Sequence, residues 1–171
     1  MARRRTPPPR VLIPATPRPR PAPMTALDTN LLLYAYSAAA PEHPAAHAFL
    51  ASLAPRDDVA LSEFILAEFY LQLRNPAIFP EPLAAAPAAH VIQAYRHHPR
   101  WRILGCPADS LAAHEALWQH AAAPQFARRR LFDARTALSL RQHGVTEFAT
   151  ANVKDFQDFG FTRVWNPLTS G

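Results

Sequence analysis

The sequence predicts an α/β fold, with short parallel strands in a central sheet and helices on both faces. Three observations lead to this prediction: brief apolar runs recur along the chain, longer stretches with helical spacing separate them, and residues that start or stop helices lie at the boundaries. Strands that alternate with helices are typical of a parallel sheet. The length of 171 residues suits one domain with a single core.

The predicted strands are brief apolar runs without helical spacing, which is the pattern of strands buried inside a sheet. The predicted strands cover residues 25–28, 59–61, 101–104, 147–150 and 163–165. Ligand sites in such sheets form beyond the carboxyl ends of the strands, so the residues that follow each run are the first candidates for a functional site.

The predicted helices are bounded by recognisable start and stop residues. Ser62 and Asp109 are candidate N-caps, because their side-chain oxygens can accept a hydrogen bond from a free backbone N–H. Pro41, the Asn75-Pro76 pair and the His143-Gly144 pair each end a helical stretch. The predicted helices cover residues 31–38, 43–53, 63–74, 83–98 with an interruption near Pro87, 109–120 and 126–142, and a short helical turn covers 152–156.

The positive charge is concentrated in the first 23 residues. The chain has 18 Lys and Arg against 13 Asp and Glu, but residues 1–23 hold six of the arginines and no acid, so the rest is nearly neutral. This segment also holds eight of the 19 prolines, and we expect it to be a disordered tail with polyproline character. It could bind phosphate groups. Alternatively, Met24 is the true start and the tail is not part of the working protein, which has its folded domain at 24–171.

The composition excludes several classes of protein. One cysteine, Cys106, permits neither an intrachain disulfide nor a cysteine-based zinc site, and it fits a reducing cytoplasm. No uncharged apolar run reaches the ~18 residues of a membrane span. The glycine-rich phosphate loops GxGxxG and GxxxxGK[ST] are both absent, which removes the familiar nucleotide-binding motifs.

Four acids lie where an ionised carboxylate is difficult to accommodate. Asp28 and Asp155 follow predicted strand ends, Glu68 lies in an apolar stretch, and Asp133 lies in a helix with apolar inner positions. An unpaired buried carboxylate is costly, so each of them requires a partner. A divalent metal ion would satisfy several at once, and oxygen ligands without cysteine favour Mg²⁺ or Mn²⁺. Such an ion can activate water against a phosphodiester. Before metal binds, the clustered charges should raise some of the carboxyl pKa values.

Each acid also has a purely structural alternative. Asp28 could cap the helix that follows it, and Glu68 could face solvent on an amphipathic helix. Asp133 could pair with one of the arginines around it, which are Arg129, Arg130 and Arg135. Asp155 could be an ordinary turn residue.

Four segments in order resemble the PIN-domain ribonucleases, and in particular the VapC-type toxins of prokaryotic toxin–antitoxin pairs. The segments are LDTNLL at 27–32, LAEF at 66–69, FDAR at 132–135 and ATANVKDF at 149–156. The resemblance extends from about Met24 to Pro167, so it covers the chain after the tail. It implies a PIN-like α/β/α sandwich around a mainly parallel sheet, and an endoribonuclease that depends on Mg²⁺ or Mn²⁺.

The resemblance also implies roles for individual residues. Asp28, Glu68 and Asp133 match the core metal ligands, and Asp155 matches a more variable fourth acid. The polar residues expected to orient water or carboxylates around them are Thr29, Asn30, Thr150 and Asn152. Arg129 and Arg130 could contact an RNA phosphate, although a solvent-exposed charged face is the commoner role for such residues.

Proteins of this kind commonly form homodimers and are inhibited by a small antitoxin protein, so the resemblance implies both partners besides RNA. Two other functions remain open at this stage. The chain could be a PIN-like nuclease outside any toxin pair, acting in RNA processing or on DNA. It could also be a catalytically silent module that binds RNA or protein, although all four acids are present.

Overall fold

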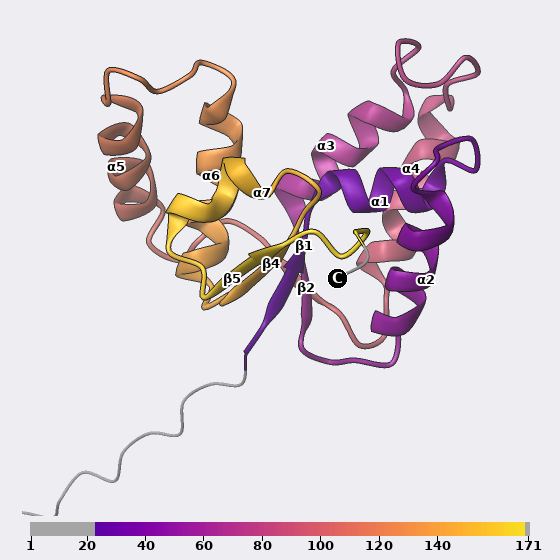
Figure 1. The fold of residues 1–171 in the computed structure, drawn as a ribbon, viewed down its shortest axis with the longest axis horizontal. Coiled ribbons are helices and arrows are strands. Elements are labelled where there is room, and N and C mark those ends of the chain that lie inside the picture. Colours follow the sequence, from indigo (N-terminus) through magenta and orange to yellow (C-terminus); the bar gives the residue numbers. More distant parts are fainter. Residues whose placement is uncertain (1–22, 170–171) are drawn as a thin grey trace, which may run out of the picture.

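The computed structural model describes residues 23–169, which form a sheet of five parallel strands between two layers of helices (Figure 1). The strands are β1 (Thr25–Leu27), β2 (Val59–Ser62), β3 (Arg102–Leu104), β4 (Glu147–Ala149) and β5 (Arg163–Trp165). The predicted fold class is therefore confirmed. The predictions for the tail lie outside the described residues, except at its last position.

The direction in which strands are added to the sheet reverses at β1. The order across the sheet is β3-β2-β1-β4-β5, so the chain builds outward from β1 on one side and then returns to continue on its other side. A reversal of this kind leaves a crevice at the carboxyl ends of the two strands that flank it. Leu27 of β1 pairs with Ala149 of β4, so the next residues, Asp28 and Thr150, both enter this crevice.

The two helical layers come from the two halves of the chain. In Figure 1 the helices of the first half lie on one side of the sheet and those of the second half on the other. The first layer has α1 (Thr29–Tyr36), α2 (His43–Leu53), α3 (Glu63–Leu73) and α4 (Ala85–Arg96), and the second has α5 (Ser110–Ala121), α6 (Arg130–Gln142), α7 (Val153–Phe156) and the 3₁₀ turn η1 (Gln157–Phe159). Among the described residues, no helix is long and apolar enough to cross a membrane.

Side-chain capping explains the starts of the helices α3 and α5. Ser62 Oγ accepts from the N–H of Phe64 (3.1 Å), and Asp109 Oδ1 accepts from that of Ala112 (2.9 Å), so both predicted N-caps are confirmed. The predicted interruption at Pro87 is wrong, because this proline lies in the first turn of α4, where an N–H has no helical partner. The helix predicted from residue 126 begins only at Arg130.

The core consists of the strands and the inner faces of both helical layers. Leu61, Phe69 and Phe148 are completely buried, as are all three residues of β1 to within 2%. Burial of large apolar side chains stabilises the fold by about 1.5–3 kcal/mol each. This packing holds the strand ends rigidly, which fixes the positions of the polar residues that follow them.

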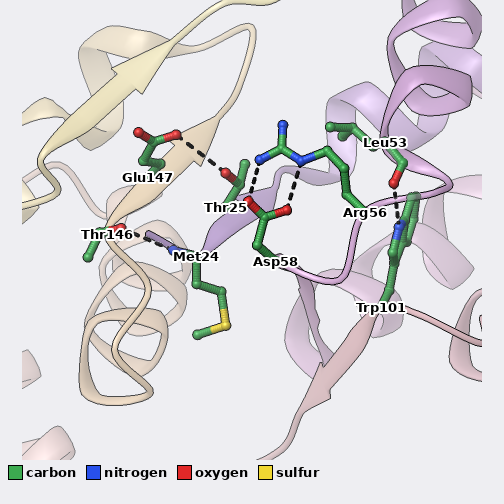
Figure 2. A network of polar contacts seen from close by, with 8 residues as sticks. All are labelled: Met24, Thr25, Leu53, Arg56, Asp58, Trp101, Thr146 and Glu147. Atoms are coloured by element: carbon green, nitrogen blue, oxygen red, sulfur yellow. Dashed lines mark hydrogen bonds and ion pairs between the residues drawn. The ribbon is translucent and has the colours of Figure 1, made fainter. Parts of the chain in front are cut away.

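The amino ends of the strands carry paired polar groups (Figure 2). Arg56 makes two hydrogen bonds to the carboxylate of Asp58, at 2.7 and 2.6 Å, and both side chains are partly exposed. Thr25 Oγ1 donates to Glu147 Oε2 (3.3 Å) between β1 and β4. The carboxylates of Asp58 and Glu147 therefore each accept a hydrogen bond from a neighbouring side chain.

Candidate active site

Asp28 lies directly after β1, at the crevice, and its carboxylate is only 8% exposed. Its Oδ1 accepts from the backbone N–H of Thr29 (2.7 Å), which caps α1 as the structural alternative suggested. Its Oδ2 accepts from Asn30 Nδ2 (2.8 Å) and from Thr150 Oγ1 (2.5 Å). All three donors are neutral, so Asp28 acts as a cap, but within residues 23–169 no cation balances its charge.

Thr150 connects the end of β4 to this network. Besides donating to Asp28, its hydroxyl accepts from Asn30 Nδ2 (3.2 Å) and from the backbone N–H of Asn152 (2.9 Å). The amide oxygen of Asn30 accepts from the N–H of Ala151 (3.2 Å). Three of the polar residues singled out in the sequence therefore hold the ends of β1 and β4 together around Asp28.

Glu68 reaches the site from α3, in the first helical layer. Its Oε2 accepts from Thr29 Oγ1 (3.0 Å). The apolar sequence around Glu68 led us to expect a buried side chain, but Glu68 is exposed. The neighbouring Ile65, Leu66 and Phe69 take up the buried positions of α3, so the helix directs Glu68 away from the core.

Asp133 and Asp155 come from the second helical layer and are both half-buried. Asp133, on α6, lines the same cavity as Asp28 and Glu68, whereas Asp155, on α7, does not line it. Arg130 Nη2 donates to the backbone carbonyl of Asp155 (3.1 Å), which attaches α7 to the start of α6. The other candidate arginine, Arg129, is exposed at the N-terminal end of α6.

The cavity between these groups has a volume of about 120 Å³. Nine residues line it: Asp28, Thr29, Asn30, Leu33, Glu68, Gln72, Asp133, Asn152 and Phe156. Gln72, which lies one turn after Glu68 on α3, was not among the site residues predicted from the sequence. The spacing could have indicated Gln72, because residues four apart on a helix share a face and Glu68 was already a candidate.

Burial, together with neighbouring negative charge, raises the pKa of Asp28 and of Asp133. Burial, aided by the charges of Glu68 and Asp133, raises the pKa of Asp28 to about 7, against the opposing hydrogen bonds from Thr150 and Thr29. Burial also raises the pKa of Asp133, with contributions from the charges of Asp155 and Glu68, while Arg130 opposes this shift. The expected direction of the pKa shift is confirmed for Asp28 and Asp133, but burial contributes more to it than the clustered charges do.

No cation pairs with these acids within the described part of the chain. Its ion pairs are Arg56–Asp58 and Arg96–Glu63, and neither involves a residue that lines the cavity. The suggested pairing of Asp133 with a neighbouring arginine is therefore wrong. The cavity is left with excess negative charge, which favours a cationic ligand.

The donor set fits a hard divalent cation. Within residues 23–169, no three His, Cys, Asp or Glu side chains form a ready-made metal cage. Mg²⁺ does not require one, because it is usually held by one or two carboxylates and keeps several waters. Asp28, Glu68 and Asp133 supply carboxylate oxygens around one cavity, while Gln72 and Asn152 supply amides that can bind those waters.

These features define a class of protein: a parallel α/β domain with an acidic cavity at the reversal of its strand order. Comparison with known proteins narrows this class. Residues 25–161 match the PIN domain family. The chain is 51% identical over 147 residues to ribonuclease VapC24 of Mycobacterium tuberculosis, a match that covers 86% of this chain and 99% of the relative. The chain therefore belongs to the PIN-domain family, in its VapC group, and the resemblance seen in the sequence is confirmed.

Solved structures share the fold at lower sequence identity. VapC20 of M. tuberculosis, described as a toxin that cleaves the sarcin–ricin loop, has a TM-score of 0.59 at 22% identity, with 80% of this chain and 95% of that chain covered. VapBC2 from Rickettsia felis, bound to a DNA fragment of its promoter, has a TM-score of 0.56 at 18% identity, with coverages of 84% and 98%. These similarities confirm the predicted PIN-like architecture.

Proposed function

We propose that this protein is the toxin of a toxin–antitoxin pair and acts as a metal-dependent endoribonuclease on RNA phosphodiester bonds. The observation that carries the proposal is the convergence of Asp28, Glu68 and Asp133 on one cavity, where no cation from the described part of the chain balances them. The close similarity to a protein named a ribonuclease supports RNA as the substrate. The family supports a nuclease in preference to a silent binding module.

The three acids would hold Mg²⁺ or Mn²⁺, which supplies an activated water and polarises the phosphodiester. The other residues position them. Thr150 and Asn30 fix the carboxylate of Asp28, and Thr29 orients Glu68. Asp155 is outside the cavity lining, but its charge helps to raise the pKa of Asp133, so we assign it an electrostatic role on Asp133.

The excess negative charge has a consequence for substrate binding. A cavity that holds three carboxylates repels an RNA phosphate in the absence of metal. We therefore expect RNA to bind tightly only when a divalent ion is present. The roles of Arg129 and Arg130 as phosphate contacts remain predictions, and Arg130 also holds the backbone of Asp155.

The partners follow from the same proposal. The Rickettsia structure contains a toxin–antitoxin complex, which supports a small antitoxin as a partner of this chain. We also propose that the protein forms a homodimer and acts in the cytoplasm, where its RNA substrates are. A short gene for a small DNA-binding protein immediately upstream would support the toxin pair.

The proposal is tested by mapping new RNA 5′ ends after brief expression of the wild type and of Asp28→Asn. The wild type should produce discrete new ends, and Asp28→Asn should produce none while its circular dichroism spectrum remains native. Asp58→Asn, at the opposite end of the sheet, is the matched control and should cleave like the wild type. Cleavage retained by Asp28→Asn in the presence of Mg²⁺ would disprove the site assignment.

A further inference from the structure

An exposed aromatic side chain lies beside the acidic cavity. Phe132 precedes Asp133 on α6 and is 63% exposed, and Leu71 on α3 is 66% exposed. Both line a groove of about 250 Å³ between α3 and α6. Soluble proteins seldom expose large apolar side chains together unless the surface has a binding function.

The groove and the acidic cavity lie next to each other. Glu68 lines both of them, so one of its sides faces the cation site and the other faces Phe132 and its neighbours. A polymer with a phosphate at the acids must continue past the rim of the cavity, and the groove adjoins this rim at Glu68.

An arginine with unused hydrogen-bonding capacity lies in the same groove. The guanidinium carbon of Arg135 lies 4.3 Å from the ring centroid of Phe64 and 5.3 Å from that of Phe132, so the two rings fix its position. Its Nε is buried without a hydrogen-bond partner, and Arg135 makes no ion pair within residues 23–169. The positive charge of Arg135 is therefore not neutralised by any acid of the described residues, while Arg135 lines the groove.

We propose that this groove binds a nucleotide adjacent to the cleaved phosphodiester, with its base stacked on Phe132 and its phosphate attracted by Arg135. This inference rests on the proposed ribonuclease function. An aromatic face next to a cation is the combination that binds unpaired nucleotides, since every base has a π face and every phosphate a negative charge. The groove volume is below the ~300 Å³ of the smaller drug-sized pockets, which suits one base.

The alternative occupant is a second copy of this chain. At a two-fold interface this groove would be covered by the other copy, and the unpaired charge of Arg135 would be buried at a cost unless that copy supplied an acid. This cost, together with the acidic cavity beside the groove, favours RNA over a second copy. The binding of RNA at the groove further predicts that the cleaved strand is locally single-stranded, because a paired base cannot stack on a side chain.

The test measures binding of a short fluorescent single-stranded RNA, with Ca²⁺ present, to the wild type and to two variants of one position. Phe132→Trp keeps a stacking face and should bind within about twofold of the wild type. Phe132→Leu keeps an apolar side chain without a π face and should bind about tenfold more weakly. Leu111→Ala, at an 83% exposed residue of α5, is the control and should bind normally.

A second arm replaces single nucleotides of the RNA by abasic ones. At one position the abasic RNA should bind the wild type about tenfold more weakly, and Phe132→Leu should add nothing further, since the same contact is already lost. Equal affinity of wild type and Phe132→Leu for intact RNA would overturn the inference. The inference would also be overturned if Phe132→Leu dissociated a dimer in sedimentation while each protomer still bound RNA normally. If the wild type neither binds nor cleaves any RNA, the proposed function itself fails.

Discussion

The two ends of the sheet treat acidic side chains in opposite ways. At the amino end, Arg56 pairs with Asp58 at 2.6 Å, and its hydrogen bonds hold the pKa of Asp58 below the usual value. At the carboxyl end, Asp28 is buried among neutral donors and other acids, and its pKa rises to about 7. The ionised form of aspartate is therefore stabilised at the amino end of the sheet and destabilised at the carboxyl end.

This contrast distinguishes acids that are paired with a cation from acids that are left unpaired in the cavity. The Arg56–Asp58 pair is partly exposed and contributes little to stability, so its loss is tolerable. The acids of the cavity lower stability, and such an arrangement persists where activity needs it. An unbalanced acid at the reversal of the strand order is therefore a stronger indication of a site than any count of acids in the sequence.

The largest expected effect is on catalysis. Asp133→Asn removes a carboxylate from the cavity and should lower RNA cleavage more than about 100-fold, because even indirect partners of metal ligands are worth 10–100-fold. Single-turnover cleavage of a mapped RNA in Mn²⁺ measures this loss. Asp58→Asn should show no such loss, and equal defects in both variants would remove the contrast between the two ends.

The next effect is the pH dependence of stability without metal. Above pH 3.8 unfolded Asp28 releases its proton, while folded Asp28 keeps it until about pH 7, so the folded form binds more protons in this range. The free energy of unfolding therefore falls as pH rises, by about 3 kcal/mol between pH 5 and 7.5 from this group.

Urea unfolding in EDTA at the two pH values measures this change. Asp28→Asn should lose that fall and be more stable than the wild type at pH 7.5. Asp58 acts in the opposite direction, because its pKa is lowered in the folded protein. The stabilisation that it contributes is present above its unfolded pKa and is lost as the pH falls through its folded pKa. A wild type that gains stability between pH 5 and 7.5 would contradict the assignment for Asp28.

A smaller effect is expected at the hydroxyl that holds Asp28. Thr150→Val keeps the shape of the side chain but removes the donor to Asp28 and the acceptor for Asn30 and Asn152. We expect a loss of about 1–3 kcal/mol in stability and a roughly 10-fold or larger loss of cleavage. Thr146→Val, which removes one acceptor for the N–H of Met24 at the other end, should cleave normally.

The smallest effect is expected for the paired charges themselves. Arg56→Ala should change the free energy of unfolding by at most about 1 kcal/mol, because the pair is accessible to water and salt. Cleavage should be unchanged. Thermal unfolding of the wild type and of Arg56→Ala at low and high salt measures the difference in their free energy of unfolding. A loss of several kcal/mol would contradict the view that charges at this end of the sheet matter little for stability.

The sequence predicted the strands well because each is a short apolar run between clear helix boundaries. It also placed Asp28 after β1, since a polar residue behind a buried strand is visible in the chain. It could not reveal that Glu68 is exposed, because this depends on which face of α3 meets the sheet. Gln72 was missed for the same reason, and Asp155 lies outside the cavity although its neighbours in sequence line it.

The reversal of the strand order also determines when the site can exist during synthesis. Asp28 and Thr150 are 122 residues apart in the chain but share a hydrogen bond, and Asp133 also comes from the late half. A growing chain that has passed Glu68 holds only two of the three cavity acids and none of the second helical layer. We expect a ribosome-bound fragment of this protein to be harmless to RNA until nearly all of the domain has emerged.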